Sequence, residues 1–341
     1  MFRQHFFHLK SILRLKNNNV FIPFKGYDFI GGPSTFMRNL RTYLDNVGYK
    51  YKSDISKSKH IFFPISYDLE FLKKIKKDKG VIIQRLDGIY YPQKHGTCYQ
   101  EKNKLIKDIY LNYATKVVFQ SQYSKAQCFT LFGEKDTDDY EIIINGVNEA
   151  IFYPRNLLTR SPKKFKLVTT GNFRNIDMLE PVIKALDTIT EFDFELHIIG
   201  PIVNDNLHDL INRDYVTYHG TKTTHQIAAL LREHHIFIYS HLNPPCPNSV
   251  LEAIASGLPV IGFNSGSMSE LLHFSPNLLA EVSDDVFQKY EDFSADKLKD
   301  KIMYCMTHFE KMKEVALVNA SNYNFKHCGE RYQKIFQNIG K

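Results

Sequence analysis

The chain has 341 residues, of which 24% are charged and 43% hydrophobic. This is the balance of an ordinary globular protein, which excludes collagen, a coiled coil and wholesale disorder, and the length predicts two domains. No stretch approaches the roughly 18 consecutive apolar residues of a membrane span, and we expect no signal peptide because charges interrupt the first residues. The five cysteines are scattered without metal-like spacing, which predicts reduced thiols in a cytoplasmic protein and no zinc site.

Positive charge is concentrated at the start of the chain. Residues 1–100 contain 18 Lys and Arg against 7 Asp and Glu, a net charge of +11, which leaves −4 for residues 101–341. A basic first third favours a surface that faces an anionic partner, such as a membrane or a phosphorylated substrate. A genome that uses lysine freely explains the charge equally well. Nucleic acid is the weakest candidate, because no zinc-finger, RNP or KH motif accompanies the charge.

The segment Phe2–Leu15 comes first and has apolar residues at helical spacing with basic residues between them. This pattern fits an interfacial amphipathic helix, and it fits a helix packed on its own domain somewhat better. The five lysines of the stretch Lys73–Lys79 extend the basic character of this part of the chain. Both features make peripheral contact with an anionic membrane a hypothesis to test.

Short apolar runs then alternate with helix-like segments. The first expected strands are Val20–Phe24, His60–Pro64, Val81–Arg85, Lys116–Gln120 and Glu141–Ile144. A second series comprises Lys166–Thr170, Glu195–Ile199, Val216–His219, Ile236–Tyr239 and Val260–Phe263. Helical periodicity marks Thr35–Leu44, Leu179–Leu186, Thr224–Leu231 and Val250–Ala255. Uninterrupted apolar strands are typical of parallel sheets buried on both faces, and their alternation with helices predicts βαβ units.

The strand series restarts after Arg155–Lys164, a charged stretch without a hydrophobic period that we interpret as a linker. The α/β pattern therefore predicts two Rossmann-like, doubly wound domains, residues 1–154 and residues 165–315. The last segment, residues 316–341, has a helical pattern with aromatic residues and could pack on either domain.

Two glycines, Gly31 and Gly32, stand between the first expected strand and the first expected helix. Glycines in this place let backbone N–H groups approach a phosphate, and the N-terminus of a helix adds partial positive charge. The pair lacks the spacing of the established phosphate-binding loops, so a plain turn explains it as well.

A second candidate site lies at the start of the expected helix near residue 250. Asn248 and Ser249 stand where the free N–H groups of a helix can bind an anion. Glu252 follows one turn later among small apolar neighbours, which predicts a half-buried carboxylate facing hydroxyl donors. A solvated helix glutamate is the alternative.

A third candidate follows the expected strand Val81–Arg85. Arg85 and Asp87 stand at its carboxyl end, the edge of an α/β sheet where ligands bind, and Tyr90 and Tyr91 come next. The pattern is typical of a sugar-facing loop, with the carboxylate on hydroxyls and the rings on apolar sugar faces. A structural pair between Arg85 and Asp87 is the other interpretation.

The segment CPNSVLEAIASGLPVIGFNSGSMSELL, residues 246–272, closely resembles the donor-site segment of family 4 glycosyltransferases. Four weaker matches occur in family order: FIGGPSTFMRNL, VVFQSQYSK, INGVNEAIFYP and LVTTGNFRN. The resemblance implies the GT-B fold, in which two Rossmann-like domains face a cleft. It also implies a nucleotide-sugar donor on the second domain, an acceptor on the first, no obligatory metal or other cofactor, and a C-terminal helix that crosses back onto the first domain.

The resemblance assigns roles to individual residues. Glu252 matches the last acid of the Glu-x7-Glu motif, which holds the ribose hydroxyls. Asn248, Ser249 and Val250 match the positions that bind the diphosphate, and Gly31 and Gly32 match the loop that closes over it. Arg174 matches the basic residue that neutralises the leaving diphosphate. Asp87 is our candidate for the polar residue on the acceptor side, with Arg85 beside it.

Two positions depart from the family. Pro244 stands where the first acid of the motif should be, and proline cannot hold sugar hydroxyls. Asp177 stands where the family has a lysine beside the diphosphate. We considered Asn243 as a partial substitute for the acid, and Lys222 or Lys25 as a substitute for the lysine.

The sequence thus predicts a cytoplasmic, retaining glycosyltransferase that moves a sugar from a nucleoside diphosphate to a hydroxyl of a glycan or lipid-linked acceptor. A catalytically weak GT-B homologue that binds a sugar nucleotide or a partner is an alternative, motivated by Pro244 and Asp177. A GT-B nucleotide-sugar epimerase is another. The one Asp-x-Asp, Asp136–Asp138, precedes a strand, so we expect no metal at the cleft.

Overall fold

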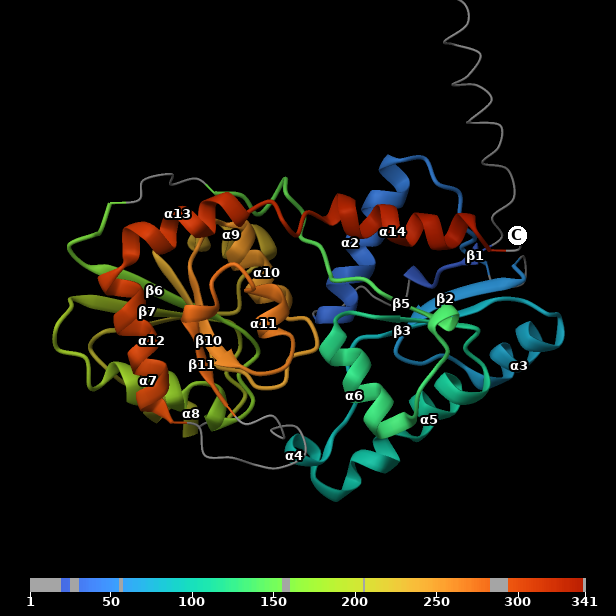
Figure 1. Cartoon of the computed structure of the whole chain (residues 1–341), viewed down its shortest axis with the longest axis horizontal. Helices are drawn as coiled ribbons and strands as arrows, with labels where there is room; N and C mark the ends of the chain where they lie inside the picture. Colours follow the sequence, from blue (N-terminus) through green and yellow to red (C-terminus); the bar gives the residue numbers. More distant parts are fainter. Residues whose placement is uncertain are drawn as a thin grey trace, which may run out of the picture.

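The computed structural model describes residues 20–24, 31–54, 58–154, 160–204, 206–282 and 294–339. They form two α/β domains that lie side by side, each built on its own parallel sheet (Figure 1). The predicted architecture of two doubly wound domains is confirmed. The segment Phe2–Leu15, Lys25 and the first half of the predicted linker, residues 155–159, lie outside the described residues.

The first domain has five parallel strands in sequential order: β1 (Val20–Phe21), β2 (His60–Pro64), β3 (Ile82–Leu86), β4 (Lys116–Phe119) and β5 (Tyr140–Ile142). Its helices are α2 (Gly32–Asn46), α3 (Leu69–Lys77), α4 (Pro92–His95), α5 (Tyr99–Asn112) and α6 (Gln122–Phe132). The strand β3 is buried along its whole length, including its polar residues Gln84 and Arg85. Its carboxyl end brings Asp87 toward the second domain.

The second domain has six parallel strands in the order β11-β10-β9-β6-β7-β8. Their bounds are β6 (Phe165–Thr170), β7 (Phe194–Ile199), β8 (Val216–Gly220), β9 (Ile236–Tyr239), β10 (Val260–Asn264) and β11 (Leu279–Glu281). The helices are α7 (Glu180–Leu186), α8 (Asn206–Leu210), α9 (Thr224–Leu231), α10 (Asn248–Ala255), α11 (Met268–Leu271) and α12 (Ala295–Thr307). The direction of winding reverses between β6 and β9, and ligands bind at the carboxyl ends of the strands beside such a switch point.

The chain crosses between the domains at two neighbouring places. The backbone N–H of Val147 donates to Tyr323 O (2.7 Å), and the N–H of Phe325 donates to Val147 O (2.8 Å). Before the second crossing, α13 (Phe309–Asn319) packs on the second domain. The two crossing segments, near Val147 and near Phe325, are thus hydrogen-bonded to one another where the domains meet.

After the crossing, α14 (Phe325–Gln337) packs against α2 of the first domain (Figure 1). Tyr332 and Phe336 are fully buried there. Gly329 lies so close to the ring of Tyr43 that an added Cβ would be 2.5 Å from it, so a side chain at 329 would force the helices apart. The stretch 316–341 is therefore not one helix, because residues 316–319 belong to α13.

Nine of the ten expected strands agree with the structure within two residues at each end, and β1 ends three residues earlier than expected. The sequence analysis missed β11, a three-residue strand at the edge of its sheet. It also named no helix at α3, α5, α6 or α12. The buried face of α6 includes Ser124 and Gln127, so polar residues conceal its helical period. In the part of the chain that the structure describes, no helix combines the length and hydrophobicity that crossing a membrane requires.

Candidate active site

A cleft of about 980 Å³ separates the two domains, and both contribute to its walls. The first domain supplies residues from the N-terminus of α2 and from the carboxyl end of β3, and the second supplies residues that follow β6, β8 and β9. Charged and helix-terminal lining residues are Gly31, Gly32, Arg38, Asp87, Lys94, Arg174, Lys222, Asn248, Ser249 and Glu252. Most residues that the sequence analysis selected are therefore brought together at one cleft.

The N-termini of α2 and α10 approach one another across this cleft. A Cβ built on Gly32 would lie 4.0 Å from Asn248 Nδ2. The N-cap residues are Gly31 and Pro247, neither of which has a side chain that can accept a hydrogen bond from the first N–H groups. Two helix N-termini with free N–H groups make a site for an anion.

Val250 differs from its neighbours Asn248 and Ser249. It is fully buried, it does not line the cleft, and its backbone N–H donates to Pro247 O at 3.2 Å. This hydrogen bond uses the backbone N–H of Val250, which was expected to bind a diphosphate. Of the three positions at the start of α10 that were expected at the diphosphate, Asn248 and Ser249 therefore line the cleft and Val250 does not.

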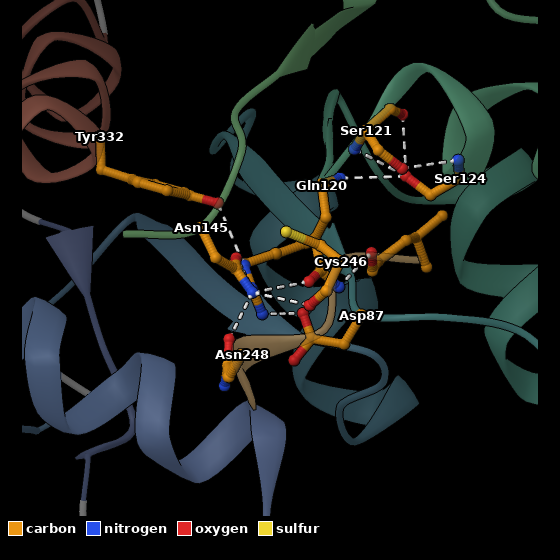
Figure 2. Close-up of polar contacts among 10 residues, drawn as sticks. Asp87, Gln120, Ser121, Ser124, Asn145, Cys246, Asn248 and Tyr332 are labelled. Carbon is orange, nitrogen blue, oxygen red and sulfur yellow. Dashed lines mark hydrogen bonds and ion pairs between the residues drawn. The ribbon is translucent and has the colours of Figure 1, made fainter. Parts of the chain in front are cut away.

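Asn145 lines the cleft and links the two domains through hydrogen bonds (Figure 2). Its Nδ2 donates to Gln120 Oε1 at 2.9 Å and to Asn248 Oδ1 at 3.0 Å, while its Oδ1 accepts from Arg85 Nη2 at 2.7 Å. The network holds the first residue of α10 against the first domain. Sequence reasoning missed Asn145, although it lies in the segment INGVNEAIFYP that carried the resemblance.

Arg85 has a structural position. Only 1% of this residue is exposed, its guanidinium lies 3.6 Å from the ring centre of Phe36, and its Nε donates to Tyr332 OH at 3.1 Å. It also forms an ion pair with Asp87. Arg85 does not line the cleft, so the substrate-binding role expected for it is corrected to the structural pair that was the alternative.

Asp87 does reach the cleft. Its side chain is 6% exposed and lines both the cleft and a second pocket of about 320 Å³, which extends between residues 88–95 and residues 242–247. Among the described residues, none donates a hydrogen bond to its Oδ2. A buried carboxylate oxygen without a donor, at the junction of two cavities, is placed to accept a hydroxyl from a bound molecule.

Glu252 lies in the second turn of α10 and lines the cleft. Burial raises the pKa of its carboxyl to about 8, because desolvation penalises the charged form. This agrees with the half-buried glutamate expected from the sequence. A ligand with two neighbouring hydroxyl groups would stabilise the ionised carboxylate, because the hydroxyls can donate hydrogen bonds to it as water would.

The positive charges of the cleft come from both domains. Arg174 follows β6 and Lys222 follows β8, both in the second domain, and Lys222 Nζ donates to His219 O at 2.6 Å. Lys94 of α4 enters from the first domain, and sequence reasoning missed it because α4 is a short helix without a period. Asp177 does not line the main cleft but a pocket of about 110 Å³ that it shares with Lys94.

Pro244, which stands where the resemblance has the first acid of its motif, lies outside the main cleft. Pro244 lines the second pocket, not the main cleft. Asn243 is only 2% exposed, has a left-handed backbone (φ 52°) and shares a side-chain hydrogen bond with Tyr91. Asn243 therefore lines the second pocket, where it contacts Tyr91 of the first domain.

Within the described residues, no group of three or more His, Cys, Asp or Glu side chains is placed to hold a metal ion. Asp136 and Asp138 precede β5, so they lie at the amino end of that strand, away from the edge that forms the cleft. All five cysteines are free thiols, and only Cys98 is exposed.

Comparisons with known proteins bear on the fold. No curated protein matches the chain in sequence. Residues 164–294 match the family described as glycosyl transferases group 1. Among solved structures, Anabaena Alr3699/HepE in complex with UDP and glucose has a TM-score of 0.69 at 13% identity, over 93% of this chain and 98% of that chain.

Two further structures are similar over most of the chain. WaaG, a glycosyltransferase involved in lipopolysaccharide biosynthesis, has a TM-score of 0.66 at 12% identity, over 93% of this chain and 98% of that one. Sucrose-phosphate synthase from Thermosynechococcus elongatus has a TM-score of 0.65 at 15% identity, over 89% and 77%. The chain therefore has the GT-B fold of glycosyltransferases, and most of its second domain matches the group 1 family.

Proposed function

We propose that the protein is a retaining glycosyltransferase that moves a sugar from a uridine diphosphate sugar to a hydroxyl group of a glycan or lipid-linked saccharide. The observation that carries this proposal is the pair of helix N-termini, α2 and α10, on opposite walls of one cleft that also holds Glu252 and Arg174. The N–H groups of the two helices can donate to a diphosphate, and Arg174 can neutralise its charge. Glu252 can accept hydrogen bonds from the ribose hydroxyls. The structures of Alr3699/HepE with UDP and with UDP-glucose support the choice of nucleotide.

The chemistry follows from where charge develops. The bond between the anomeric carbon and the diphosphate oxygen breaks as a new bond forms from that carbon to the acceptor oxygen. Negative charge accumulates on the diphosphate, so donors already aimed at it by Arg174 and the two helices lower the barrier. In a retaining transfer the acceptor approaches on the same face, and a diphosphate oxygen takes its proton.

The second pocket is our candidate for the acceptor. It joins the main cleft at Asp87, and its walls include Tyr90, Tyr91 and three prolines of the second domain. Aromatic rings pack on the apolar faces of sugars, and Asp87 Oδ2 can accept from an acceptor hydroxyl. Because this pocket shares Asp87 and Lys94 with the main cleft, we expect it to lie next to the anomeric carbon of a bound donor.

Thermal stabilisation by a panel of nucleotide-sugars tests donor binding, because a ligand that binds the folded state raises the melting temperature by mass action. Release of UDP that depends on an added acceptor then identifies a transferase. A weak homologue would bind without releasing UDP, and an epimerase would convert the donor without an acceptor. We expect full activity in EDTA; activity lost in EDTA and restored by Mg²⁺ would contradict the proposed site.

A basic face on α3 supports a peripheral, cytoplasmic enzyme with a lipid-linked acceptor. Lys73, Lys74, Lys76, Lys77 and Lys79 are all exposed, while Leu72 and Ile75 anchor the helix in the core. The helix lies on the side of the first domain away from the second (Figure 1). Each lysine near an anionic membrane contributes about 1 kcal/mol.

Sedimentation with anionic vesicles at low and high salt tests this membrane contact. We expect salt-sensitive pelleting that is lost when the five lysines are replaced by glutamine. A protein that stays in the supernatant at low salt would favour a soluble acceptor.

A further inference from the structure

We propose that Lys94 of the first domain is the partner of Arg174 in binding the donor diphosphate, at the phosphate farther from the ribose. This inference rests on the proposed function and assigns a second cation to its donor site. The diphosphate would then be held by one positive side chain from each domain.

The position of Lys94 carries the first step. The residue is the third of the four residues of α4 and lines three adjoining cavities: the main cleft, the second pocket and the smaller pocket that contains Asp177. Among the described residues, only Lys94 and His241 line all three. Since burial lowers the pKa of His241 to about 3, its imidazole is neutral and Lys94 is the cation where the cavities meet.

The charges around Lys94 carry the second step. Burial and the charge of Arg174 lower the pKa of Lys94, and Asp177 acts in the opposite direction. Two cations from different domains therefore lie close enough to repel one another, and neither forms a salt bridge with another described residue. An anionic phosphate group between them would relieve that repulsion and satisfy both.

The order of residues along the cleft carries the third step. Glu252 and Asn248 line the main cleft only, whereas Lys94 and Asp87 also line the second pocket. If Glu252 holds the ribose and α10 the first phosphate, Lys94 lies one phosphate farther along, beside the bond that breaks. A cation there stabilises the charge that develops on the leaving group.

This position also gives Asp177 a role. The resemblance places a lysine at residue 177, where this chain has a carboxylate. Asp177 faces Lys94 in the small pocket and favours its charged form. The carboxylate would thus hold a first-domain lysine in the cleft in place of the second-domain lysine that is absent.

Isothermal titration of UDP and UMP into the full chain and its variants tests the inference. Lys94→Ala should weaken UDP binding by about tenfold or more, the usual worth of a hydrogen bond to a charged group, and should change UMP binding less than about twofold. Lys94→Arg should restore most of the UDP affinity. Lys104→Ala is the matched control, because Lys104 is an exposed lysine of the same domain that lines none of the three cavities.

Because Lys94 and Arg174 would contact the same phosphate, the effects of Lys94→Ala and Arg174→Ala on UDP binding should not add in the double variant. UDP binding by Lys94→Ala at wild-type affinity would overturn the inference and leave the proposed function standing. So would equal losses for UDP and UMP. A wild-type chain that binds neither nucleotide would overturn the proposed donor itself.

Discussion

Glu270 of the second domain accepts a hydrogen bond of 2.7 Å at Oε1 from the backbone N–H of Tyr123 in the first domain. Its Oε2 accepts another, of 2.8 Å, from the N–H of Gln122. Both donors belong to the first turn of α6, whose N-terminus favours a negative charge. Beside them, the Ser121 hydroxyl donates to Pro245 O at 2.6 Å. These contacts hold the two walls of the cleft at a fixed separation.

We therefore expect Glu270→Ala to lower the free energy of unfolding by about 1–2 kcal/mol. It should also raise the radius of gyration of the nucleotide-free protein, because the domains lose their charged contact. Urea titration and small-angle X-ray scattering measure the two effects. Glu233→Ala, at an exposed glutamate of the same domain, is the control. Unchanged values for Glu270→Ala would show that other contacts fix the cleft.

The buried pair of Arg85 and Asp87 gives a second prediction. Arg85→Met removes the guanidinium and leaves the Asp87 carboxylate buried beside an apolar chain, which costs about 3–5 kcal/mol of stability. The double variant Arg85→Met/Asp87→Asn should recover part of that loss, since no buried charge remains. Urea unfolding of both variants measures this. A loss below about 1 kcal/mol for Arg85→Met would contradict the structural role.

Arg85 also shows what the sequence alone could not settle. Its strand was predicted as Val81–Arg85 from a short apolar run, because such runs identify the strands of a parallel sheet. Its partners, however, lie 60 residues away at Asn145 and 247 residues away at Tyr332. Only the packing of α14 on the first domain brings these groups together. Arg85 was expected to bind a sugar, but its burial and these hydrogen bonds give it a structural role.

The candidate donor site was more predictable because it depends on local features. Glu252, Asn248 and Ser249 share one helix, so their spacing in sequence is their spacing in space. Lys94 belongs to a four-residue helix, and its approach to Arg174 depends on how the two domains sit together. The sequence analysis accordingly considered Lys222 and Lys25 instead.

Glu252 provides a third prediction, based on pH. In the empty cleft its pKa is about 8, and ribose hydroxyls that donate to the carboxylate would favour the ionised form. UDP binding then releases a proton, so affinity should increase from about pH 7 to pH 8 and level off near pH 9. Titration of UDP at these pH values measures it. Glu252→Ala should weaken binding by about 10–150-fold.

Glu252→Gln is the matched control for this pH dependence, because it keeps the shape and cannot ionise. Its affinity for UDP should be flat over the same range. The pKa of Glu252 is about 4.5 in the unfolded chain and about 8 in the folded protein. The nucleotide-free wild-type protein should therefore lose stability as pH rises between these two values, and Glu252→Gln should not. A wild-type affinity independent of pH would contradict a ribose contact by the carboxylate.

Buried histidines of the second domain produce the opposite dependence at lower pH. His234 is 5% exposed, its Nδ1 lies 2.6 Å from Leu230 O, and its ring centre lies 4.4 Å from that of His197. Burial lowers the pKa of His234 and of His235 to about 4, against an ordinary value of 6.5. Both imidazoles are therefore neutral in the folded protein at neutral pH.

The unfolded chain binds protons at these histidines below about pH 6.5, whereas the folded chain binds them only near pH 4. The free energy of unfolding should therefore fall as pH decreases through this window, by about 1–3 kcal/mol for each histidine. Urea titrations at about pH 7.5, 6 and 5 measure the slope. His234→Gln should reduce it, and His327→Gln, at an exposed histidine of α14, should leave it unchanged. An identical slope in wild type and His234→Gln would show that the His234 imidazole takes up its proton equally in the folded and unfolded chain.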